Sequence, residues 1–178
     1  MEIEGEKIII RQNNLSEFNY NFILRWLTDP EVMKYVGYFR RTFFFKSKEQ
    51  AREFFEALED GVFFGIYLKN SDELIGYATL SNFNPEKKEC KFGIVIGEKR
   101  YWGQGAGSEV ALLVAGYAFI KLKQDKVTLT CAEANRAAIK AYENAGFEVV
   151  QRIPKERTIF LNGRWQLHGT IKMSKDKK

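Results

Sequence analysis

The sequence predicts an α/β fold with a mixed β-sheet flanked by helices, in the order β-ααα-βββ-α-β-α-ββ. Segments that alternate between apolar and polar residues, typical of strands, are interspersed with segments whose apolar residues recur at helical spacing. Strand-helix-strand stretches favour right-handed parallel crossovers, whereas short turns at 70–72 and 162–163 favour antiparallel hairpins. A chain of 178 residues fits one domain, 1–178, and the lysine-rich residues 175–178 are expected to form a disordered tail.

The first third of the chain is predicted to contain one strand and three helices. Residues 7–11 (KIIIR) are typical of a strand, and helical spacing follows from 18 to 27. Asp29 is a favourable N-cap and proline suits the first helical position, so a short helix is expected over 30–35. The third helix is predicted over 48–60, where apolar residues again line one face.

The remaining elements are predicted to be a three-stranded meander followed by alternating helices and strands. The segment 108–122 is apolar on nearly all sides, which is typical of a helix packed hard against a sheet. Asn135 begins the last helix, which Gly146 ends. The predicted strands are 62–70, 74–82, 90–96, 126–131 and two strands joined at Asn162-Gly163.

Three glycines in WGQGAG (102–107) stand where the strand at 90–96 passes into a helix. Backbone N–H groups at such a helix N-terminus favour an anion, and glycine leaves them accessible while allowing positive φ. No Lys-Ser or Lys-Thr follows, which excludes a P-loop. The spacing G-x-G-x-G also departs from the dinucleotide fingerprint, and Asp125 precedes its strand instead of ending it. A turn that serves tight packing alone remains an alternative.

Together with the segment 135–147 (NRAAIKAYENAGF), this loop resembles motifs of the GNAT superfamily of N-acetyltransferases, closest to its RimJ/RimL-like branch. The segments LRWLTDPEVMKYVG, FGIVIG and FLNGRW extend the resemblance over nearly the whole chain. It implies a twisted, mostly antiparallel sheet and a loop that holds the pyrophosphate of acetyl-CoA. Two registers fit the loop motif, 102–107 and 100–105. We favour the first, because its glycines then begin the helix.

The resemblance also implies the site residues. The pantetheine of acetyl-CoA is expected in a splay between the strands at 90–96 and 126–131, and Tyr142 is expected to protonate the leaving thiolate. No metal is expected. The residues predicted to contact acetyl-CoA are Val95, Ile96, Trp102, Gly103, Gln104, Gly105, Ala106, Gly107, Ser108, Asn135 and Ala138.

Two of these roles have simpler alternatives. A phenol with a pKa of about 10 can protonate a thiolate whose conjugate acid has a pKa near 8.5, but Tyr142 could equally be a core aromatic. Asn135 lies two helical turns before it on the same face, and it could serve only as a helix N-cap.

No general base is evident from the sequence. Glu98 and Glu133 lie near strand ends, where charged residues are usually just solvated, and His168 is expected at the surface or the rim of a cleft. An α-amine, with a pKa of about 7.7–8.0, needs less deprotonation than a lysine-like amine near 10.4. We therefore predict transfer to a primary amine, a protein N-terminal α-amine. Alternatives are an amino-sugar nucleotide, an aminoglycoside or a polyamine, and a catalytically silent CoA-binding module.

The resemblance places the acceptor between the first two helices and the last hairpin. There the sequence has aromatics with Arg40 and Arg41 over 35–45, and Arg164 and Trp165 on the hairpin. Guanidinium groups suit carboxylates or phosphates and would repel a polycation. The alternative is that the phenylalanines of this segment pack on the core and the arginines are simply solvated.

Net charge and the lack of long apolar runs indicate which partners and which compartment to expect. The net charge of +5 is spread along the chain, so nucleic acid is an unlikely partner; a homodimer remains open. No apolar run approaches a membrane span and no signal peptide is evident, so we expect a cytoplasmic protein. Cys90 and Cys131 are expected as reduced, packed thiols.

Overall fold

The computed structural model describes the chain except for residues 14–19, 36–48, 51–52, 54–60 and 162–163. The described strands are β1 (Glu2–Glu4), β2 (Ile8–Gln12), β3 (Val62–Leu68), β4 (Leu74–Asn84), β5 (Glu89–Ile96), β6 (Lys126–Ala132), β7 (Glu148–Leu161) and β8 (Arg164–Asp176). The described helices are α1 (Tyr20–Leu27), α2 (Pro30–Met33), the 3-10 turn η2 (Lys99–Tyr101), α4 (Ala106–Ile120) and α5 (Arg136–Asn144).

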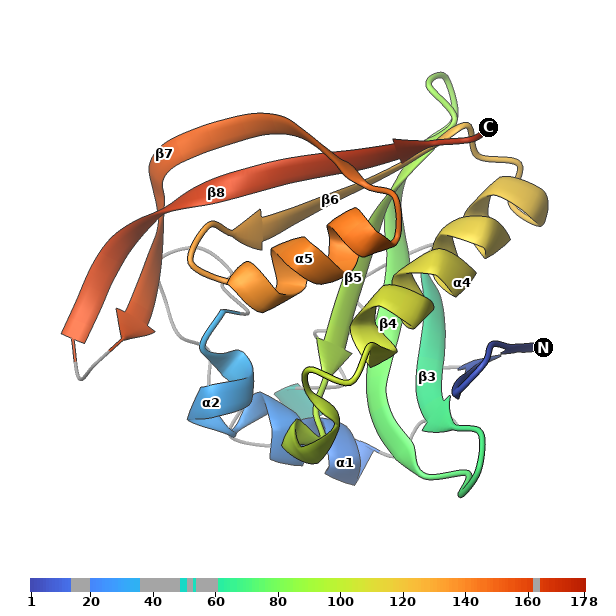
Figure 1. The fold of residues 1–178 in the computed structure, drawn as a ribbon, viewed down its shortest axis with the longest axis horizontal. Coiled ribbons are helices and arrows are strands. Elements are labelled where there is room, and N and C mark those ends of the chain that lie inside the picture. The colour runs from blue at the N-terminus through green and yellow to red at the C-terminus, as the bar shows by residue number, and fades with distance from the viewer. Residues whose placement is uncertain (14–19, 36–48, 51–52, 54–60, 162–163) are drawn as a thin grey trace.

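These strands form one eight-stranded sheet in the order β1-β2-β3-β4-β5-β6-β8-β7 (Figure 1). Every neighbouring pair is antiparallel except β5 and β6, which are parallel. The prediction of a mixed, mostly antiparallel sheet flanked by helices is confirmed.

Two details differ from the sequence-based expectation. The sequence did not suggest β1, which pairs with β2 at the edge of the sheet. The prediction of a disordered tail is wrong for Lys175 and Asp176, because both residues belong to β8 and pair with β6. The Lys175 Nζ donates to the carbonyl of Ala145 at 2.6 Å, which fixes the end of β8 against α5. Most of the third predicted helix lies outside the described residues.

Helices α4 and α5 cover one face of the sheet (Figure 1). Val110 and Val114 of α4 have no exposed surface, as the apolar pattern of this helix predicts. The Glu109 carboxylate accepts hydrogen bonds from the amides of Lys7 and Ile8, at 2.9 and 3.1 Å, so α4 is also fixed to the start of β2.

Helices α1 and α2 pack on the opposite face. Strand register places Tyr77 of β4 beside Val95 of β5, on the side that faces these helices. The buried cluster there consists of Ile23, Trp26, Leu27, Val32, Phe63, Tyr77 and Val95. The centre of the sheet is therefore buried on both faces. None of the described helices is long and apolar enough to cross a membrane.

The pairing of β5 with β6 is short. It covers only Glu89 with Lys126, Cys90 with Val127 and Lys91 with Thr128. Both strands continue without pairing to each other, and Figure 1 shows them diverging from a common start, with α5 across the opening. We call this opening the β5–β6 gap; it matches the predicted splay.

The far end of β5 is fixed by close contact with α1. A Cβ atom added to Gly97 would lie 2.0 Å from Cδ2 of Trp26, whose side chain is only 2% exposed. The Trp26 Nε1 donates to Glu98 Oε1 at 2.8 Å. The indole can occupy this place only because residue 97 has no side chain.

This contact predicts that Gly97→Ala destabilises the protein by about 1–3 kcal/mol, the usual cost of overpacking a core. Gly116→Ala is the matched control, since a Cβ at this helical glycine meets nothing within 4 Å. We expect the control to stabilise α4 by about 0.5–1 kcal/mol. Urea unfolding of both variants provides the measurement, and equal stabilities would show that Trp26 is not held as described.

Candidate active site

The glycine-rich loop connects η2 to α4. Gly103 and Gly105 have φ of 74° and 92°, in the left-handed region, and Gly105 is the N-cap of α4. A Cβ at either position would meet no protein atom within 4 Å. Backbone conformation, and not tight packing, therefore explains these two glycines, and the space beside them is open.

The start of α4 offers a row of unpartnered N–H groups. Within the described part of the chain, the amides of residues 103–107 donate to no protein acceptor. The next two amides, of Ser108 and Glu109, both donate to the carbonyl of Gly105. Free amides and the positive end of the helix dipole together favour an anion, so the loop fits the pyrophosphate of acetyl-CoA. A Cβ at Gly107 would make an ordinary contact with Ala141 at 3.6 Å, so packing does not require glycine at this position.

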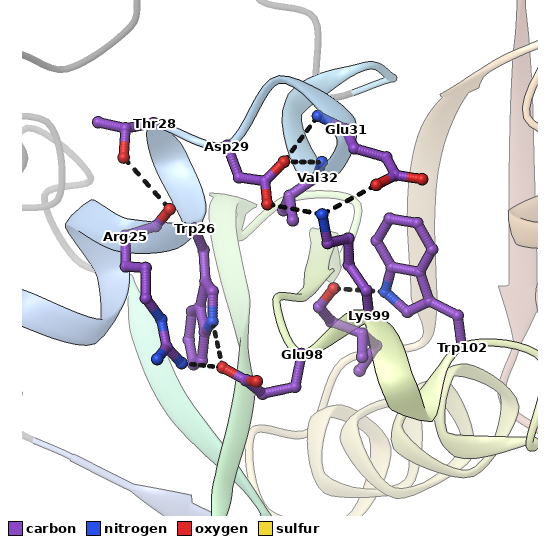
Figure 2. A network of polar contacts seen from close by, with 10 residues as sticks. Arg25, Trp26, Thr28, Asp29, Glu31, Val32, Glu98, Lys99 and Trp102 are labelled. Atoms are coloured by element: carbon purple, nitrogen blue, oxygen red, sulfur yellow. Dashed lines mark hydrogen bonds and ion pairs between the residues drawn. The ribbon is translucent and has the colours of Figure 1, made fainter.

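The loop is anchored to the strand and turn before it. The Trp102 Nε1 donates to the carbonyl of Ile96 at 2.8 Å, and the indole stays 40% exposed (Figure 2). The Gln104 Nε2 donates to the carbonyl of Arg100 at 2.6 Å. Both side chains therefore stabilise the conformation of the loop.

The two residues that follow Gly97 connect the loop with α1 and α2 (Figure 2). Glu98 accepts from Trp26 and forms an ion pair with Arg25. The Lys99 Nζ bridges Asp29 at 2.9 Å and Glu31 at 2.8 Å.

Asp29 also caps α2, as predicted, by accepting from the amides of Glu31 and Val32. Burial acts to raise the pKa of Asp29, but the hydrogen bonds from Lys99 and these amides outweigh it and lower the pKa overall. The carboxylate is therefore ionised where it holds the start of α2.

The backbone of β5 presents only alternate residues to the β5–β6 gap. The amide of Gly97 donates to Ile75 in β4, whereas the carbonyl of Cys90 accepts from Thr128 in β6. Because successive residues of a strand point to opposite sides, the N–H groups of Ile94 and Ile96 face the gap, and that of Val95 faces β4. Of the two predicted amides only Ile96 is placed for a ligand in the gap. The sequence did not point to Ile94.

Tyr142 lies against both strands at the gap. Its ring makes edge contacts with Phe92 of β5 and with Phe147, each at 6.2 Å between centroids. Cys131 of β6 is close enough to act on its pKa, and burial raises that pKa above the ordinary value of a phenol. The side chain is 8% exposed, and its hydroxyl has no hydrogen-bond partner among the described residues. Tyr142 is thus a packed aromatic whose hydroxyl is still available.

Asn135 is the N-cap of α5. Its Oδ1 accepts from the amide of Ala138 at 3.2 Å, which confirms the N-cap interpretation and occupies that amide. The Nδ2 has no partner within the described part of the chain, so a contact with acetyl-CoA remains open to the Asn135 amide group. Contacts from Ala138 are limited to its side chain and carbonyl.

The acidic residues considered as general bases are both occupied. Glu98 is held by Arg25 and Trp26, and Glu133 pairs with Arg152 at 3.2 Å. His168 is half-buried, and its Nε2 is buried without a hydrogen-bond partner among the described residues, so it is not a fully exposed surface residue. Its other expected position, at the rim of a cleft, stays a prediction.

The two cysteines are free and buried, which confirms them as packed thiols. Burial raises the pKa of Cys131 to about 11 and that of Cys90 to about 12. At neutral pH both are protonated and poor nucleophiles. Of the predicted acceptor site, residues 36–45 and the side chain of Trp165 lie outside the described residues; Arg164 is exposed.

Comparison with known proteins agrees with this geometry. The family model of the acetyltransferase (GNAT) domain matches residues 7–148. A Bacillus licheniformis protein named as an uncharacterized N-acetyltransferase, p20, is 24% identical over 149 residues, which are 80% of each chain.

Two solved structures share the fold. A GNAT-family acetyltransferase from Bacillus anthracis superposes with a TM-score of 0.75 at 21% identity, covering 99% of this chain and 98% of that one. A spermidine N-acetyltransferase from Vibrio cholerae, solved with CoA and spermine, gives 0.78 at 21% identity, covering 96% and 95%. With most of its length matched by the family model, and with a free-amide loop beside a divergent strand pair, this chain belongs to the GNAT family of acetyltransferases.

Proposed function

We propose that this enzyme transfers the acetyl group of acetyl-CoA to a primary α-amine, that of a protein N-terminus, by direct attack. The observation that carries the proposal is the row of unpartnered amides at 103–107, next to the gap beside which Tyr142 lies. An anion site made of backbone groups and a proton donor at an open strand pair are what acetyl transfer from a thioester requires.

Each part of the site has a role in this proposal. The amides of 103–107 would hold the pyrophosphate. The N–H groups of Ile94 and Ile96 face the gap, where one of them would donate to the thioester oxygen as negative charge develops on it. Tyr142 would give its proton to the departing thiolate. Burial raises the pKa of Tyr142, so its proton is present throughout the physiological pH range.

Direct attack is favoured over an acyl-enzyme route. Cys131 is close enough to Tyr142 to act on its pKa, but the raised pKa of Cys131, about 11, keeps its thiol protonated. The amine of the acceptor is then the nucleophile that the site has to accommodate.

The occupied carboxylates support an α-amine acceptor. Glu98 and Glu133 are in ion pairs and would have to leave them to accept a proton. An α-amine with a pKa of about 7.7–8.0 is appreciably neutral in the cell, whereas a lysine-like amine near 10.4 is not. A polyamine is the rival acceptor, because a structural neighbour binds spermine. At 21% identity that likeness extends to the fold alone.

Gly105→Ala tests the loop. A Cβ here would enter the open space beside the free amides, and we expect the Kd for acetyl-CoA to rise about tenfold or more, since charge-assisted hydrogen bonds are worth about 1.5–3 kcal/mol. Gly146→Ala is the matched control because φ there is 81°, so it carries similar backbone strain outside the loop. Calorimetry that gives the same affinity for both variants would remove the loop from the cofactor site.

Tyr142→Phe tests the proton donor. We expect kcat to fall by about 10²–10⁴-fold with little change in acetyl-CoA affinity, because only a hydroxyl is lost. Tyr117→Phe removes another buried hydroxyl and serves as the control. Because the pKa of Tyr142 is raised, the wild-type kcat should not fall through phenol ionisation below about pH 10. Wild-type turnover in Tyr142→Phe would assign the proton to water or another group.

The acceptor is tested by initial rates at equal concentrations of an N-terminal peptide, spermidine and a 4-amino-sugar nucleotide. We expect the peptide to be preferred over spermidine, and its kcat/KM to rise with pH and level off near the pKa of its α-amine, about 8. A clear preference for spermidine would overturn the α-amine proposal. If none of the tested amines leads to release of CoA while acetyl-CoA still binds, the result would favour a silent CoA-binding module.

A further inference from the structure

We propose that Lys91, Lys172, His168 and Thr170 form an anion-binding subsite for a carboxylate or phosphate group of the acceptor. We call these four residues the Lys91–Lys172 cluster. The inference rests on the proposed function only in naming the acceptor as the source of the anion. The cluster lies on the face of the sheet that carries α1 and α2, opposite α4 and α5.

Strand register places the four side chains on one face. Lys91 of β5 pairs with Thr128 of β6, and Lys172 of β8 pairs with Thr130 of β6. Residues that pair directly share a face, and alternate residues of one strand share it too. The other two members, His168 and Thr170, therefore point to the same side as Lys172, and Lys91 points there from two strands away.

The two lysines have no acidic partner among the described residues. Neither forms an ion pair or hydrogen bond within the described part of the chain, although both are half-buried. Burial, followed by the positive charges of Arg157 and Lys172, lowers the pKa of Lys91. Partly desolvated cations that face each other without a carboxylate are unfavourable, and a bound anion would relieve this repulsion.

Two further polar atoms of the cluster lack partners. The Oγ1 of Thr170 and the Nε2 of His168 are buried and make no hydrogen bond with any residue that the structure describes, and Thr170 is only 3% exposed. Buried polar atoms in native proteins are nearly always satisfied, by protein, water or a ligand. The Thr170 hydroxyl, an imidazole N–H of His168 and the two ammonium groups are all potential donors on one face of the sheet, and Thr170 is the next residue after Lys172 on that face of β8. Donors of this kind are what a carboxylate or phosphate needs.

Lys91 lies where the β5–β6 gap opens, because its pair with Thr128 is the last one between the two strands. Arg157 of β7 pairs in register with His168, and its charge also acts on the pKa values of Cys131 and Tyr142. The Arg157 Nη1 donates to the carbonyl of Tyr35, just after α2, at 3.4 Å. An acceptor with its amine in the gap could therefore place a nearby anionic group on the cluster.

The first experiment compares acceptors that differ only in the anion. Ala-Asp-Gly-Gly-amide is paired with Ala-Asn-Gly-Gly-amide, and glucosamine 6-phosphate with glucosamine, which separates a peptide carboxylate from a sugar phosphate. We expect wild-type kcat/KM to favour the anionic member of at least one pair by about tenfold. Lys91→Met/Lys172→Met should reduce that ratio at least fivefold and change the rate of the neutral member less.

Lys87→Met is the matched control, since it removes an exposed lysine from the turn between β4 and β5. It should leave the ratio unchanged. Methionine keeps most of the aliphatic stem of lysine, so the double variant is expected to fold. If it does not fold, Lys91→Met and Lys172→Met are measured separately in its place. Anionic and neutral acceptors with equal kcat/KM in the wild type, or a preference that survives in the double variant, would overturn the subsite.

The second experiment does not depend on transfer. Inorganic phosphate is titrated into protein saturated with CoA, so that the loop at 103–107 is already filled. Wild type and Lys87→Met should bind phosphate, and Lys91→Met/Lys172→Met should bind it at least tenfold more weakly. This result would support the subsite even if no amine were acetylated, in which case only the proposed function fails. Equal phosphate affinity in all three proteins would reject the subsite.

Discussion

The site depends on the short parallel contact between β5 and β6. Each strand is paired along its other side: β5 with β4 from Glu89 to Ile96, and β6 with β8 over its whole length. After three positions the two ladders diverge, so each strand follows its antiparallel neighbour. Backbone groups of β5 that would continue a ladder then face an opening, where a substrate amide or thioester can pair with them.

A second constraint joins the two faces of the sheet at the end of β5. Glu98 and Lys99 contact α1 and α2, and only a few residues later the free amides at 103–107 begin. Exposed ion pairs such as that of Lys99 contribute little to stability, typically about 0–1 kcal/mol. Their effect is on position, since the buried Trp26 against Gly97 sets where the strand ends and the loop begins.

Local pattern was sufficient for much of this architecture. Glycines with a strand before and a helix after indicated the loop, and Asn135 and Asp29 indicated their helix starts, because caps and positive φ are properties of a few consecutive residues. Which β5 amide faces the gap depends on register, which is set by β4 and β6. The sequence therefore did not separate Val95 from Ile96 or point to Ile94. The ordered conformation of Lys175 and Asp176 was not predicted for the same reason, because these residues pair with β6, which is far away in the sequence.

The two faces differ in how they could recognise charge. On the α4 side, backbone amides and a helix dipole supply the donors, so recognition of a phosphate there needs glycine but no particular charged side chain. On the α1–α2 side, the donors of the Lys91–Lys172 cluster are side chains on strands β5 and β8. Strand pairing holds these positions through backbone groups, so side-chain substitutions there would leave the gap unaltered while changing the proposed acceptor subsite. Under the two proposals, cofactor binding would depend on main-chain geometry and acceptor choice on side-chain identity, so the two would be separable in this fold.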